Sequence, residues 1–60
     1  MDETARITIE NHLYLQKEQA YKARDGAIKN GRSEEYIQMW EDMGNLYNEL
    51  FKQVKNMKQK

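Results

Sequence analysis

Few side chains in this 60-residue sequence have the chemistry that catalysis requires. Nucleophilic catalysis needs a nucleophile, a base that activates it and a third group that orients the base. The chain has one histidine, His12, and no cysteine, so His12 would have to take its catalytic partners from another subunit. No glutamate stands three residues before His12, the spacing used by di-metal helical bundles. We therefore predict a protein that is not an enzyme and has no catalytic residues, bound metal or cofactor.

Two basic side chains in the first half of the chain could bind an anion. Lys17 and Arg24 are seven residues apart, which places them on one side of a helix, near Tyr14 and Tyr21. Two copies meeting at a symmetric interface could hold a phosphate-bearing or nucleotide-like ligand with these cations. The simpler interpretation is that their aliphatic stems pack while their charged ends reach solvent. Binding or sequestering a small anion is therefore an alternative function.

The overall charge favours protein partners over nucleic acid. Ten basic and ten acidic side chains cancel, so no net field attracts the chain to nucleic acid or to an anionic membrane. Two helices joined by a glycine turn superficially resemble a helix-turn-helix, but that motif uses shorter helices and a third supporting helix. Nucleic-acid binding is a second alternative function, which the interleaved charges disfavour.

Large apolar side chains recur through the second half of the chain in steps of four and three residues, the spacing of one helix face. With a neighbouring row, they cover about half of the helix circumference, more than one adjacent helix normally covers. We therefore expect this helix to associate with a further helix as well. The predicted interface consists of Leu13, Ala20, Tyr36, Trp40, Met43, Tyr47, Leu50, Phe51 and Val54.

The pattern predicts helices near residues 3–30 and 34–58, joined by a turn at 30–33. Gly31 can adopt the left-handed conformation that ends a helix, and Ser33 can cap the next helix. Asp2 or Thr4 could cap the first helix. Two alternatives remain open: residues 6–9 alternate as a short strand would, and Gly26 could end the first helix early.

Small residues recur on the expected contact face of the first helix. Ala20, Ala23 and Ala27 allow close approach of another helix, and we expect the region of Trp40 and Tyr47 to lie against them. A second line, about a quarter-turn away, repeats every seven residues and implies a second contact. Its members are Ile7, Tyr14, Tyr21 and Ile28.

These observations predict an all-α fold: one antiparallel two-helix hairpin over residues 1–60. We expect it to form a homodimeric four-helix bundle, with coiled-coil packing, or a larger symmetric assembly, because so short a chain buries only about 60% of its unfolded surface by itself. No apolar run approaches the roughly 20 residues of a membrane span. We predict a cytoplasmic regulator, inhibitor or assembly factor, of a kind typical of small bacterial or phage proteins, that binds itself and one protein target.

Overall fold

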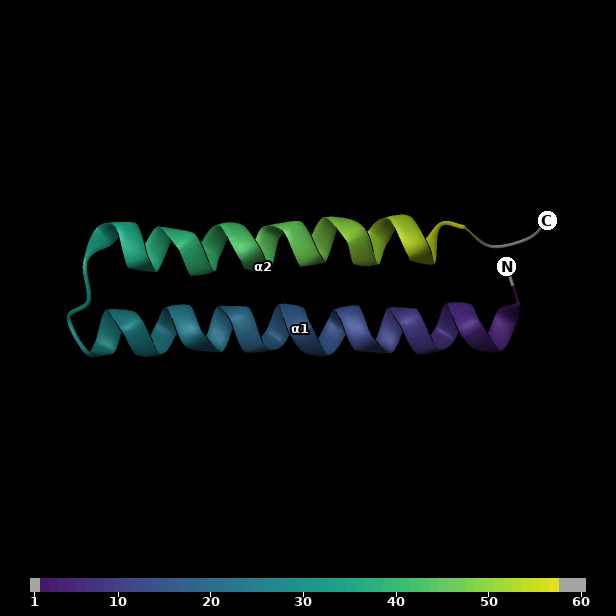
Figure 1. Cartoon of the computed structure of the whole chain (residues 1–60), viewed down its shortest axis with the longest axis horizontal. Helices are drawn as coiled ribbons and strands as arrows, with labels where there is room; N and C mark the ends of the chain where they lie inside the picture. Colours follow the sequence, from purple (N-terminus) through teal and green to yellow (C-terminus); the bar gives the residue numbers. More distant parts are fainter. Residues whose placement is uncertain (1, 58–60) are drawn as a thin grey trace.

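The computed structural model describes residues 2–57 and consists, over these residues, of two helices packed side by side. Helix α1 spans Glu3–Lys29 and helix α2 spans Glu34–Lys55. They run antiparallel and form a rod with extents of 46 × 13 × 10 Å (Figure 1). The predicted all-helical hairpin is confirmed. Its association with other chains stays a prediction.

The turn between the helices has the backbone geometry predicted for it. Gly31 adopts a φ of 69°, in the left-handed region that glycine enters at little cost. The Arg32 amide donates to the Ala27 carbonyl at 2.9 Å, and the Gly31 amide donates to the Ile28 carbonyl at 3.2 Å. This pair of hydrogen bonds is a Schellman motif, which satisfies carbonyls that the end of α1 would leave unpaired.

Ser33 caps α2 as predicted: its Oγ accepts a hydrogen bond from the Tyr36 amide at 3.2 Å. At the start of α1 the capping residue is Asp2, but its side chain makes no capping hydrogen bond. Helix α1 passes through residues 6–9 and Gly26 without a break, so neither the strand nor the early end occurs. Helix α2 ends at Lys55, before the predicted end at 58, a residue that lies outside the described range.

Contacts between the helices define a single antiparallel register. Arg24 pairs with Glu41, Tyr21 with Asn45, and the Tyr14 ring lies near the Phe51 ring, so the residue numbers of each pair add up to 65 or 66. This register places the alanines of α1 at the level of the bulky residues of α2.

The centre of the hairpin is built from small residues. Ala20 is 2% exposed, Ala27 and Gly44 are also buried, and no large side chain among residues 2–57 is fully buried. Close approach of the two helices therefore leaves the larger apolar side chains along the edges of their contact. Neither described helix is long and apolar enough to cross a membrane.

Candidate interaction surface

Helix α2 carries a continuous stripe of uncovered apolar side chains. Leu46 is 59% exposed, Tyr36, Met39, Leu50 and Met57 are also exposed, and Met43 is half-buried. On a helix with about 100° between residues, the five side chains that belong to α2 lie within one narrow arc, and Met57 follows just beyond the end of the helix. We call this surface the α2 apolar face; it consists of Tyr36, Met39, Met43, Leu46, Leu50 and Met57.

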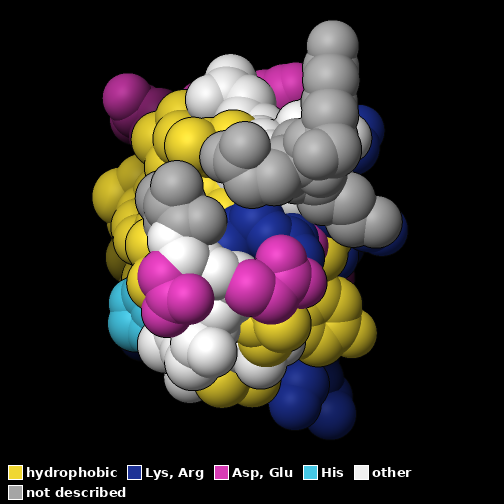
Figure 2. Space-filling view, turned by 90° about the vertical axis from the view of Figure 1, so that its right-hand side faces the viewer, with side chains coloured by type: hydrophobic (Ala, Val, Ile, Leu, Met, Phe, Trp, Pro, Cys, Tyr) yellow, Lys and Arg dark blue, Asp and Glu magenta, His cyan; other side chains and the backbone are white. Residues whose placement is uncertain are grey.

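This face lies on one flank of the hairpin. Met43 precedes the buried Gly44 and Asn45 follows it, so their side chains project to opposite sides of the contact between the helices. The end-on view shows hydrophobic side chains gathered at the left of the upper helix, α2, and a second group at the lower right, over α1 (Figure 2). Apolar side chains are therefore exposed in two separate groups, one over each helix (Figure 2).

The residues predicted as an interface divide between the interior of the hairpin and this face. Ala20 is buried, and Leu13, Trp40 and Phe51 are half-buried, as are Met43, Tyr47 and Val54. Tyr36 and Leu50 are exposed. The hairpin thus covers most of these residues at least in part and leaves Tyr36 and Leu50 exposed. Whether a second copy covers them stays a prediction.

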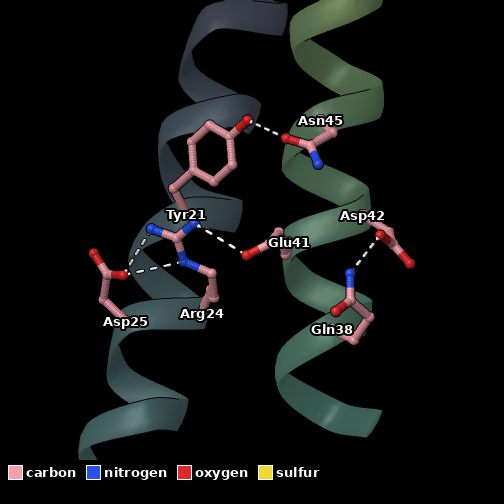
Figure 3. A network of polar contacts seen from close by, with 7 residues as sticks. All are labelled: Tyr21, Arg24, Asp25, Gln38, Glu41, Asp42 and Asn45. Carbon is pink, nitrogen blue, oxygen red and sulfur yellow. Dashed lines mark hydrogen bonds and ion pairs between the residues drawn. The ribbon is translucent and has the colours of Figure 1, made fainter. Parts of the chain in front are cut away.

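The opposite flank carries the polar contacts between the helices. The Tyr21 hydroxyl donates to Asn45 Oδ1 at 2.7 Å, and the Arg24 guanidinium contacts Glu41 at 3.5 Å (Figure 3). Over residues 2–57, these are the two hydrogen bonds that join side chains of the two helices. They fix the position of α1 along α2, since a shift of either helix would break both.

On the same flank, a side chain of α1 lies close to the backbone of α2. The Tyr21 ring lies against the backbone at Gly44, where a Cβ atom would stand 2.6 Å from Cδ1 and 2.9 Å from Cζ of the ring. Contacts of this length are far below van der Waals separation, so this position accepts only glycine unless Tyr21 moves. Gly44 therefore allows the Tyr21 ring to pack closely against the backbone of α2.

The two predicted anion-binding cations already have acidic partners. Arg24 Nη2 lies 2.9 Å from Asp25 Oδ1, and its guanidinium also faces Glu41. The hydrogen bond to Asp25 raises the pKa of Arg24 above its ordinary value, with a smaller contribution from Glu41. Lys17 Nζ lies 3.7 Å from a Glu18 oxygen and 4.7 Å from the centre of the Tyr14 ring. These surroundings favour internal pairing over anion binding.

The second line on α1 forms a ridge on this polar flank, which we call the tyrosine ridge: Ile7, Tyr14, Tyr21 and Ile28. Its two tyrosines are held in place, Tyr21 by Gly44 and Asn45, and Tyr14 by Phe51, whose ring centre is 6.0 Å away. Ile7 and Ile28 are exposed. The ridge is thus apolar at its ends and immobilised at its centre.

An ion cluster near the start of α1 is centred on Arg6, whose burial the sequence did not indicate. Arg6 is 6% exposed, and its guanidinium lies 2.8 Å from both Glu3 and Glu10. The i, i+3 and i, i+4 spacings on one helix bring both carboxylates within reach of Arg6. Two carboxylates offset the cost of removing one guanidinium from water.

Trp40 has the one buried side-chain nitrogen or oxygen in the described part that lacks a hydrogen-bond partner, its indole Nε1. The Tyr36 ring packs edge-on against the indole, with centres 6.4 Å apart. A buried N–H without an acceptor costs about 1–3 kcal/mol. Trp40 therefore contributes to stability through its apolar ring and not through its polar atom.

Within residues 2–57 there is no pocket, and no group of three histidine or acidic side chains that could hold a metal ion. The candidate site is accordingly a surface. Comparisons with protein-family models, with curated proteins and with solved structures found no match.

Proposed function

We propose that this hairpin is a non-enzymatic protein-interaction module that works as a helical homodimer, a four-helix bundle in which the α2 apolar face is buried. The observation that carries this proposal is the exposure of four apolar side chains in one arc of α2, with the half-buried Met43 among them and the exposed Met57 just beyond the end of the helix. Exposed contiguous apolar surface of this kind marks interaction sites in soluble proteins. A regulator, inhibitor or assembly factor is the functional class that such a module fits.

The free energy gained by burying exposed apolar side chains favours association of two hairpins. Burying an exposed leucine or methionine fully contributes about 1.5–3 kcal/mol, and the face presents several of them to a single partner. A chain of 60 residues has little stability of its own, and its described interior consists mainly of two alanines and a glycine. A second hairpin would supply the missing core.

The test is light scattering across a concentration series, with circular dichroism on the same samples. We expect a helical dimer with twice the 7.2 kDa mass of the chain. Leu50→Glu should weaken the dimer at least about 100-fold, because it buries a carboxylate in the apolar contact. Ile28→Glu, a charge placed at a 56% exposed site on the opposite flank, should leave the dimer intact.

A wild-type protein that stays monomeric and fully helical at every concentration would overturn the proposal. So would equal dimerisation of the Leu50→Glu and Ile28→Glu variants, because the two charges lie on opposite flanks.

A further inference from the structure

The α2 apolar face needs a partner helix that is equally apolar. On the same flank of α1, Ile9 and Leu15 are exposed at the two edges, and between them lies the row Ala5, His12, Gln19 and Gly26, which recur every seven residues. The side chains of this row are small or polar, so the α1 of another copy would place histidine and glutamine against Met43 and Leu50. Among the two helices of the chain, α2 itself carries the matching stripe.

The order of residues along the face suits pairing with its own copy in the antiparallel direction. Tyr36, Met43, Leu50 and Met57 follow one another at intervals of seven. An antiparallel pair centred between Leu46 and Tyr47 brings Met43 of one copy opposite Leu50 of the other, and brings Tyr36 near Met57, just beyond the end of α2. Every member of the row thereby meets an apolar residue.

Charge favours the same direction. The first nine residues of α2 carry four acidic side chains, Glu34, Glu35, Glu41 and Asp42, and no basic one. Its last four residues carry Lys52 and Lys55 and no acidic one. Glu41 and Lys52 lie on the opposite flank, so the effect acts at the level of whole helices: antiparallel pairing brings the acidic first half of each helix near the basic end of the other, whereas parallel pairing brings the two acidic halves together. Antiparallel helix dipoles also attract.

We propose that a second copy docks on the α2 apolar face through its own α2, antiparallel, about a two-fold axis beside Leu46 and Tyr47. This inference rests on the proposed function, that the face is buried by self-association. The arrangement leaves the tyrosine ridges of the two copies on opposite outer sides of the bundle. The dimer therefore presents the same immobilised ridge twice.

Cysteine cross-linking tests the arrangement directly, because the chain has no cysteine of its own. Met43→Cys and Leu50→Cys are prepared separately, mixed by unfolding and refolding together, and oxidised with diamide. We expect the mixture to give a covalent dimer on a non-reducing gel. Each variant alone should give little, because identical positions are then seven residues, or about 10 Å, apart along the axis, beyond the reach of a disulfide.

Asn45→Cys and Lys52→Cys form the matched control, with the same spacing on the other flank, and their mixture should not cross-link. Strong cross-linking of Met43→Cys alone would indicate parallel pairing and overturn the proposal. A dimer by light scattering whose mixed variants stay uncross-linked would overturn the arrangement while leaving self-association in place. A monomer by light scattering would remove both.

Discussion

The two flanks of α2 differ although they belong to one helix. On the flank that contains Asn45, side chains of α1 and α2 meet through a tyrosine hydroxyl and a guanidinium, and an aromatic ring covers Gly44. On the flank that contains Met43, apolar side chains extend beyond the reach of α1. Directional contacts fix the hairpin register on one side, while non-directional apolar surface remains available on the other. One helix thus makes directional contacts within the hairpin on one flank and leaves apolar side chains exposed on the other.

Trp40→Ala should have the largest effect on the stability of the hairpin. Trp40 is half-buried and lies at the border between the contact with α1 and the α2 apolar face. Loss of a tryptophan from a packed site costs about 3–5 kcal/mol, comparable with the whole stability of a small domain. Urea unfolding followed by circular dichroism at fixed protein concentration measures the change.

Trp40→Phe is the control for that variant. It keeps an aromatic ring and removes the buried N–H that has no acceptor, so its free energy of unfolding should stay within about 1 kcal/mol of wild type. An alanine variant as stable as the phenylalanine variant would show that the indole ring is not part of the core.

Gly44→Ala tests the close approach on the polar flank. A new methyl group would displace the Tyr21 ring, and overpacking of this kind costs about 1–3 kcal/mol. Alanine recovers about 1 kcal/mol of helix propensity, so the net loss should be about 1 kcal/mol. Thermal melts of Gly44→Ala and Gly26→Ala should shift in opposite directions, because nothing lies within 4 Å of a Cβ at position 26. Two shifts of the same sign would contradict the contact between Tyr21 and Gly44.

Tyr21→Phe should have an effect about as small as that of Gly44→Ala. It deletes the hydroxyl that donates to Asn45 and leaves the ring in place, which costs about 0.5–1.5 kcal/mol. Tyr14→Phe is the matched variant, since the Tyr14 hydroxyl has no hydrogen-bond partner in the described structure, and it should unfold at the wild-type denaturant concentration. An equal loss in both variants would assign the effect to the tyrosine ridge in general and not to the bond with Asn45.

The architecture of the hairpin could be predicted because its signals are local. The four-three spacing of apolar residues indicated two helices, and the combination of Gly31 and Ser33 indicated where one ends and the next begins. These features depend on neighbours within a few residues, which a sequence displays directly.

The details of the surface depend on register, which periodicity alone does not determine. Spacing alone places Gly44 in a helical row, but its contact with Tyr21 follows from the alignment of the two helices, since these residues are more than twenty positions apart in sequence. Likewise, Lys17 and Arg24 matched an anion site by spacing, while the structure places acidic side chains beside both. The burial of Arg6 was missed for the same reason.

The constant register has a consequence for how the hairpin forms. Because paired residues lie at equal sequence distances from the turn, each new contact closes a loop only slightly longer than the last, so its entropic cost stays small. The contacts between the helices can therefore form in order, starting next to Gly31 and ending at the far end of the hairpin. This order is expected for a fast-folding chain with mostly local contacts. The cluster around Arg6, far from the turn, would be the last to close and the first to open.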